Sequence, residues 1–321
     1  MKIFGITLGD PCGIGIEVTI KALLKEPSYQ KEALLFGPLS VLEYYNKRLK
    51  ANFTFNVIET IEEFKMGMIN VVDPHPVKLE DVLIGKVSAL GGEVAFEAVR
   101  TAIEFARRKE ISSVITAPLN KEALHLAGHR FAGHTEIFAH YAEGDSYAML
   151  LSSPKLTVIH VSTHQSLRSA CDAVTKKRVL EVIRLGAETM KKFGYPHPRI
   201  AVAGLNPHAG ENGLFGDEEI RQIIPAIEAA KNEGHDVTGP IAPDTVFLRA
   251  IKGDWDIVVV MYHDQGHIPL KLLAFDDGVN ITVGLDVVRT SVDHGTAFDI
   301  ADKLIASEQS MLKAIELGKK L

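Results

Sequence analysis

The sequence is poor in cysteine, in basic runs and in long apolar runs. Of its 321 residues only Cys12 and Cys171 are cysteines, in unrelated contexts, which excludes a disulfide framework and a cysteine-based zinc ribbon. We therefore expect a reducing, cytoplasmic setting. No run approaches about 18 uninterrupted apolar residues, and the N-terminal apolar run breaks at Gly-Asp-Pro, too early for a signal segment, so we expect no membrane partner.

The charge balance is acidic. Lysine and arginine total 35 against 41 aspartate and glutamate, a formal net charge of −6, and no basic run is present. This argues against a nucleic-acid partner, whose phosphates need neutralising. With 46% hydrophobic and 24% charged residues, the composition is that of a globular protein, and the length favours two domains.

Several well-known motifs are also missing. The sequence GDPCGIG at residues 9–15 fails the GxGxxG dinucleotide pattern because its third position is Val18. No GxxxxGK[ST] phosphate loop and no HExxH metalloprotease motif occur. The 9–15 loop follows a strand and precedes a helix, which suits either a sharp turn or an anion cradle, and the spacing favours the turn.

Short apolar runs alternate with stretches of helical periodicity, which predicts an α/β fold with mainly parallel sheets. The predicted strands are Lys2–Leu8, Ala33–Phe36, Ile69–Val72, Ser112–Thr116, Leu156–Val161, Arg199–Ala203, Asp256–Met261 and Val279–Val283. The predicted helices are Gly91–Lys109, Val174–Phe193 and Asp217–Lys231. We expect the last of these to kink or restart at Pro225.

Histidines follow three of these strands. His164, His208 and His263 each lie just beyond a predicted strand end, where ligands bind in open α/β sheets. Three neutral imidazoles with an open fourth position would form a catalytic metal site, for which zinc or a similar borderline ion is favoured. The alternative is that each is an ordinary loop histidine, and the joint placement favours the metal site.

Other polar residues lie in loops or near strand ends. His134 and Thr135 occupy a Gly-His-Thr turn, where an imidazole and a hydroxyl could meet a polar substrate. Lys271 and Arg289 lie in Gly/Asp-rich segments on either side of Asn280. Lysine and arginine are natural clamps for phosphate and carboxylate, so we favour a ligand-binding role over a solvated surface.

Seven motifs occur together in one order. They are GDPxGIG from Gly9, TAPLNK from Thr116, GHTE from Gly133, NPHAGE from Asn206, PDT from Pro243, MYHDQG from Met261 and RTSxDHGT from Arg289. Together they resemble the PdxA family, the 4-hydroxythreonine-4-phosphate dehydrogenases of pyridoxal phosphate synthesis. The resemblance runs from residue 3 to about residue 302.

The resemblance implies a fold similar to isocitrate and isopropylmalate dehydrogenases, with two α/β/α lobes and an active site in the cleft between them. We expect one lobe to comprise residues 1–128 and 285–321 and the other residues 129–284. The resemblance also implies a homodimer in which the partner subunit completes each active site. It further implies that NAD binds without the GxGxxG motif. By residue match, the divalent metal ligands are His164, His208 and His263. The substrate contacts by the same match are His134, Thr135, Lys271, Asn280 and Arg289.

The implied reaction is NAD-dependent and metal-dependent oxidation of the C3 hydroxyl of a 4-phosphorylated four-carbon hydroxy acid, followed by decarboxylation. The segments 210–218, 243–248 and 265–271, the last containing His267, resemble the branch acting on 4-phospho-D-threonate or D-erythronate 4-phosphate. The alternative substrate is 4-hydroxythreonine-4-phosphate.

Zinc is the favoured metal, with Mg, Mn or Co as alternatives. Asp244 and Asp264 are candidates for the general base. A metal-dependent hydrolase of a phosphorylated acid and a non-catalytic sugar-phosphate binding module remain as other classes.

Overall fold

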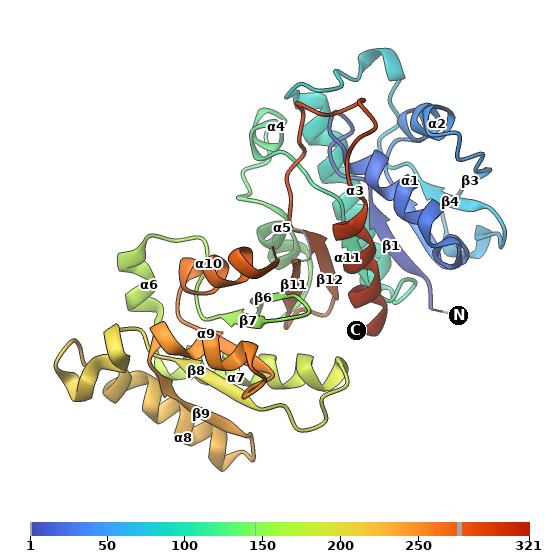
Figure 1. Cartoon of the computed structure of the whole chain (residues 1–321). Helices are drawn as coiled ribbons and strands as arrows, with labels where there is room; N and C mark the ends of the chain where they lie inside the picture. The colour runs from blue at the N-terminus through green and yellow to red at the C-terminus, as the bar shows by residue number, and fades with distance from the viewer. Residues whose placement is uncertain (1, 145, 275–277) are drawn as a thin grey trace. The chain divides into compact units, whose positions relative to one another are not determined.

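The computed structural model describes residues 2–144, 146–274 and 278–321. The chain divides into two compact units, drawn in Figure 1. Unit 1 comprises Met1–Gly144 and Leu285–Lys319, and unit 2 comprises Asp145–Gly284 with Lys320–Leu321. Each has its own strands, helices and buried core.

Unit 1 is built on strands in the order β3-β4-β2-β1-β5-β12. Each neighbouring pair runs parallel, so the carboxyl ends of the strands share one edge. The strands are β1 (Phe4–Thr7), β2 (Ala33–Phe36), β3 (Phe55–Val57), β4 (Ile69–Val72), β5 (Val114–Thr116) and β12 (Arg289–Val292). The helices are α1 (Gly15–Lys25), α2 (Leu39–Arg48), α3 (Ala89–Arg107), α4 (Lys121–Leu126), α5 (His134–Tyr141) and α11 (Gln309–Lys320), with 3-10 turns η1 (Pro27–Lys31), η2 (Ile61–Glu63) and η3 (Leu79–Asp81).

Unit 2 has the strand order β11-β6-β7-β10-β8-β9. Strand β6 pairs antiparallel with β7 and β11, and the other neighbours run parallel. The strands are β6 (Ala148–Ser152), β7 (Thr157–His160), β8 (Ile200–Ala203), β9 (Val237–Ile241), β10 (Ile257–Val260) and β11 (Val279–Val283). The helices are α6 (Leu167–Ala173), α7 (Lys176–Lys192), α8 (Ile224–Asn232), α9 (Pro243–Ile251) and α10 (His263–Ala274), with the turn η4 (Pro207–Gly213) and the π-helix η5 (Glu219–Ile223).

The predicted α/β class with mainly parallel sheets is confirmed. All eight predicted strands are present, and β2, β4 and β11 begin and end at the predicted residues. The helix predicted over residues 217–231 restarts where expected, because η5 gives way to α8 one residue before Pro225. Four strands, β3, β6, β9 and β12, were not predicted.

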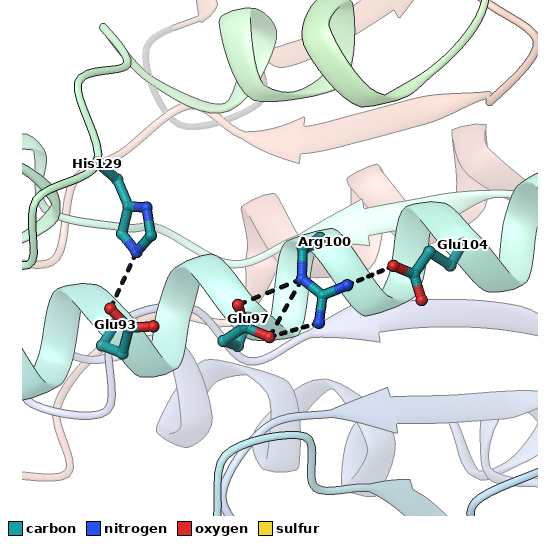
Figure 2. Close-up of polar contacts among 5 residues, drawn as sticks. All are labelled: Glu93, Glu97, Arg100, Glu104 and His129. Atoms are coloured by element: carbon teal, nitrogen blue, oxygen red, sulfur yellow. Dashed lines mark hydrogen bonds and ion pairs between the residues drawn. The ribbon is translucent and has the colours of Figure 1, made fainter.

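Residues 129–144, which we expected in the second lobe, pack within unit 1. Ile137 and Phe138 of α5 are fully buried in the same core cluster as Val99 of α3. His129 lies over α3, where its Nε2 is 2.9 Å from Glu93 Oε2 (Figure 2). Its ring also stacks on Phe96, with ring centres 3.6 Å apart. Buried apolar surface and ring stacking therefore hold this segment on α3.

Along the same face of α3, Arg100 pairs with Glu97 and Glu104 one turn away on either side (Figure 2). Such pairs at helical spacing stabilise an exposed helix face modestly. Among the helices that the structure describes, none is long and apolar enough to cross a membrane.

Candidate active site

Two of the three predicted metal ligands lie together in unit 2. His164 follows β7 and His263 opens α10, and their ring centres are 5.8 Å apart. Two imidazoles sharing a zinc ion at Zn–N distances of about 2.0–2.1 Å have ring centres roughly 5–6 Å apart. Both rings line a pocket of about 500 Å³, whose other walls include Thr163, Tyr262 and Asp264. The spacing of this histidine pair therefore suits half of a metal site.

The His263 ring is held from two sides. Asp264 Oδ1 lies 2.7 Å from its Nδ1, which leaves Nε2 as the ligating nitrogen. His267, one turn further along α10, stacks on it with ring centres 3.6 Å apart and an angle of 11° between the planes. The Nδ1 of His267 donates to the carbonyl of His263 at 3.0 Å. These contacts fix the ring orientation and tautomer of His263.

Behind His267 lies a second buried histidine, His160, at the end of β7. Burial, together with the nearby His263, lowers the pKa of His267 to about 4, and burial together with the nearby His267 lowers that of His160 to about 3. Gly266 allows this packing, because a Cβ there would lie 2.5 Å from His160 Nε2. Both imidazoles are therefore neutral near pH 7.

The third predicted ligand, His208, stands apart from this pair. It lies in η4, where Pro207–Gly213 contains six successive residues with positive φ, from 44° to 95°. Its side chain is 61% exposed, and its Nδ1 contacts Glu211 Oε2 at 3.1 Å. As at His263, a carboxylate on Nδ1 leaves Nε2 for a ligand.

Within residues 2–144, 146–274 and 278–321, no group of three or more His, Cys, Asp or Glu side chains is arranged to hold a metal ion. The donor chemistry fits a divalent metal, because the carboxylate-backed imidazoles of His263 and His208 are typical ligands. A single chain, however, brings together only His164 and His263 of the predicted three.

In unit 1, Arg289 is a buried cation at the start of β12, only 3% exposed. Its Nε and Nη2 donate to Thr116 Oγ1 at 3.2 and 3.1 Å, and its Nη1 donates to Thr135 Oγ1 at 3.3 Å. The guanidinium carbon lies 5.7 Å from the centre of the Phe138 ring. Burial lowers the Arg289 pKa to about 9, and the negative charge of Glu136 opposes this shift. The group stays cationic at neutral pH.

His134 adjoins this cation at the first turn of α5. Burial and the charge of Arg289 hold the pKa of His134 well below its usual range, so the imidazole is neutral. Its Nε2 is buried and has no hydrogen-bond partner among the described residues. The structure thus groups Arg289, Thr135 and His134, as the sequence predicted, and adds Thr116 to them.

Three predicted residues lie elsewhere. Lys271 is exposed on α10, two turns beyond His263 and close enough for its charge to lower the His267 pKa. Asn280 is half-buried on β11, opposite Leu151, and its buried Oδ1 has no hydrogen-bond partner within the described residues. Asp244 is exposed in the first turn of α9.

The loop of residues 9–15 is a structural turn. The N–H groups of Asp10 and Ile14 donate to the carbonyls of Pro118 and Thr296, and that of Cys12 donates to Asp10 Oδ1. These donors are satisfied within the chain, which favours the turn over the anion cradle. Gly9, at φ +71°, is required here because a Cβ would lie 2.2 Å from the Pro118 carbonyl oxygen.

The site also contains residues that sequence reasoning did not single out. Thr116 begins the TAPLNK motif and Glu211 ends the NPHAGE motif, but the sequence alone predicts no role for either. A signal for Thr116 was available, because it is the last residue of a buried strand and strand ends carry ligands in such sheets. Taken together, the residues offer imidazoles for a divalent ion in unit 2 and a buried cation with hydroxyls for an anion in unit 1.

A family model described as "Pyridoxal phosphate biosynthetic protein PdxA" matches residues 29–318. The chain belongs to the PdxA family. The D-threonate 4-phosphate dehydrogenase of Salmonella typhimurium is 50% identical over 323 residues, covering 100% of this chain and 99% of that protein. Its namesake from Pectobacterium atrosepticum is 47% identical over 330 residues, again 100% and 99% of the two chains. The predicted enzyme class, a dehydrogenase, is confirmed.

Solved structures similar to this chain include a dehydrogenase of high sequence identity and a more distant one. A 4-hydroxythreonine-4-phosphate dehydrogenase from Klebsiella pneumoniae superposes with a TM-score of 0.86 at 46% identity, covering 99% of each chain. A β-decarboxylating dehydrogenase from Thermococcus kodakarensis is only 16% identical, with a TM-score of 0.54 over 99% of this chain and 82% of that one. This second likeness shows the fold alone, which is the one the sequence predicted.

Proposed function

We propose that this PdxA-family dehydrogenase oxidises the C3 hydroxyl of 4-phospho-D-threonate with NAD, after which the β-keto acid product loses CO2. The observation that carries the proposal is the 50% identity, over the whole chain, to a protein named D-threonate 4-phosphate dehydrogenase. The protein would act in the cytoplasm, in keeping with its two free cysteines.

Arg289, His134 and Thr135 are assigned to an anionic group of this substrate. A buried guanidinium attracts an anion strongly because little water screens its charge. The neutral His134 adds a hydrogen bond without competing for the anion as a second cation. Lys271 and Asn280 are assigned to the remaining polar groups of the substrate.

His164, His208 and His263 are assigned to a divalent metal, with zinc favoured for three imidazoles over Mg, Mn or Co. When bound, the ion supplies Lewis-acid polarisation of the reacting hydroxyl. Because His208 stands apart from the other two in one chain, we assign the third ligand of each site to the partner subunit's His208 in a homodimer. Asp264 and Glu211 orient the ligating rings from Nδ1.

Exposed apolar side chains in unit 2 support this homodimer. Those at least 48% exposed are Leu167, Leu214, Phe215, Ile220, Leu248, Ile268 and Leu272, and their exposure reaches 82% at Leu272. Exposed apolar side chains suit a protein interface where they adjoin, as Ile268 and Leu272 do one turn apart on α10. The two named on α10, Ile268 and Leu272, lie on the helix that carries His263.

The general base has two candidates. Asp264 contacts His263, a contact that suits holding the imidazole better than taking a substrate proton. Asp244, which is exposed like Asp264 but is not engaged with a predicted ligating imidazole, is therefore the better candidate for proton transfer.

The second candidate substrate is 4-hydroxythreonine-4-phosphate, favoured by the 46% identical Klebsiella pneumoniae structure that carries this name. It differs from the first mainly in an ammonium at C2 in place of a hydroxyl.

NADH formation, followed at 340 nm with each phospho-acid before and after chelator treatment, tests the enzyme class. We expect metal-dependent NADH formation. Release of inorganic phosphate without NADH would indicate a hydrolase, and binding with no turnover would indicate a binding module.

A further inference from the structure

Strands β5 and β12 set Thr116 beside Arg289 through their register. Arg289 pairs with Val114 and Ser291 pairs with Thr116, so Thr116 is the diagonal neighbour of Arg289 on the same face of the sheet. Diagonal neighbours lie within reach of a long side chain. The contact is therefore built by the backbone of two paired strands rather than by a loop.

The Thr116 hydroxyl has all its hydrogen-bonding capacity engaged. Its oxygen accepts from Nε and Nη2 of Arg289, at 3.2 and 3.1 Å, and its O–H donates to the carbonyl of Thr290 at 3.4 Å. A hydroxyl has one donor and two acceptor positions. Because Nε and Nη2 form one edge of the planar fork, two bonds along that edge fix the plane of the guanidinium.

This contact orients the cation without cancelling its charge. A carboxylate at the same edge would pair with the guanidinium and compete with an incoming anion, whereas a neutral hydroxyl does neither. Thr116 is fully buried, so water does not replace the contact.

We propose that Thr116 is a positioning residue that holds the Arg289 guanidinium in the plane in which it receives the anionic group of the substrate. This inference rests on the assignment of Arg289 to substrate binding in the proposed function. Thr116 acts through Arg289 and does not itself contact the reacting atoms.

The neighbouring strand offers a matched control. Thr7 on β1 pairs directly with Thr116, is equally buried, and its hydroxyl has no hydrogen-bond partner among the described residues. Thr7→Val and Thr116→Val thus make the same chemical change at the same level of one sheet. Only the second removes an acceptor from Arg289.

The test is steady-state kinetics of the metal-loaded enzyme with 4-phospho-D-threonate and saturating NAD. We expect Thr116→Val to raise KM about tenfold with kcat within about twofold, since the lost interaction is made equally in the ground and transition states. Thr116→Ser, which restores the acceptor, should return KM to within about threefold of wild type. Thr7→Val should leave both constants unchanged. Thr116→Ala is measured beside the valine variant, with the same expectation, in case the valine variant does not fold.

Arg289→Lys distinguishes the positioning role of Thr116 from the substrate-binding role of Arg289. If it raises KM while Thr116→Val and Thr116→Ala leave KM unchanged, the positioning role is wrong and the function proposal stands. If Arg289→Lys also leaves KM unchanged, the assignment of Arg289 to the substrate is wrong. A rise in KM for Thr7→Val equal to that for Thr116→Val would show a general packing effect and would also overturn the inference.

Discussion

Asp10 is a fully buried carboxylic acid in the turn that follows β1. Its Oδ1 accepts the Cys12 N–H at 2.9 Å, and its Oδ2 has no hydrogen-bond partner among the described residues. The first turn of α3 lies so close that a Cβ on Gly91 would be 2.5 Å from Oδ1. Burial raises the pKa of Asp10 to about 6, and the Cys12 hydrogen bonds oppose the shift.

Asp10 therefore makes stability depend on pH. Between about pH 4 and 6 the unfolded chain has lost this proton while the folded protein keeps it, so folding stability falls as the pH rises through this window. The loss is on the order of 3 kcal/mol for a shift of this size. Urea unfolding at pH 4.5 and pH 7 should show Asp10→Asn gaining stability relative to wild type at the higher pH. An equal difference at both pH values would show that Asp10 titrates normally.

At this scale the sequence predicted residue types better than contacts. The placement of His164 and His263 beyond strand ends followed from the alternation of strands and helices. The separation of His208 did not, because it lies in a run of left-handed backbone that includes Ala209 and Glu211, which are not residue types that favour this region. The hydrogen bonds that Arg289 donates to Thr116 could not be predicted either, since they depend on the β5–β12 register.

Among the elements, β12 shows why some strands escaped prediction. Its sequence RTSV begins with a charged residue and continues with two polar ones, yet all four are buried. A run that begins with arginine does not have the apolar pattern of a buried strand, and in the structure the hydroxyls of Thr116 and Thr135 and the charge of Glu136 help to compensate the burial of Arg289. The charged residue at its start therefore kept β12 from being predicted as a strand.

The contact between α3 and α4 is a backbone contact that depends on Gly92. A Cβ there would lie 2.0 Å from the carbonyl oxygen of Ala123. We expect Gly92→Ala to destabilise the protein by about 1–3 kcal/mol through overpacking, although alanine favours helix by up to about 1 kcal/mol. Chemical denaturation measures the difference. The control is Gly186→Ala in α7, where the nearest atoms are methyl groups of Ile257 and Ile159 at 3.3 and 3.4 Å. Equal effects for the two variants would contradict the account of Gly92.

For the whole molecule, the homodimer proposal makes a complementation prediction. His208→Ala and His263→Ala should each abolish metal binding and activity as pure dimers. If the third ligand is the partner subunit's His208, a heterodimer of the two variants holds one intact site, and an equal mixture after subunit exchange should regain about a quarter of wild-type activity. Light scattering should give a mass near twice 35.1 kDa. No recovery in exchanged mixtures would show that each chain supplies all its own ligands.

The acidic net charge of −6 is compatible with a doubly anionic substrate. Local cations decide binding, and Arg289 is buried where solvent screens it least. The whole-chain resemblance explains why the enzyme class was predictable from sequence, whereas the two candidate substrates differ mainly in the group at C2, which a resemblance over the whole chain does not specify.

The most direct test of the account compares kcat/KM for 4-phospho-D-threonate and 4-hydroxythreonine-4-phosphate on the same metal-loaded preparation with NAD. We expect NADH formation with the threonate preferred by at least about tenfold, which corresponds to roughly 1.4 kcal/mol of transition-state discrimination. A preference for 4-hydroxythreonine-4-phosphate, or no NADH from either compound, would contradict it.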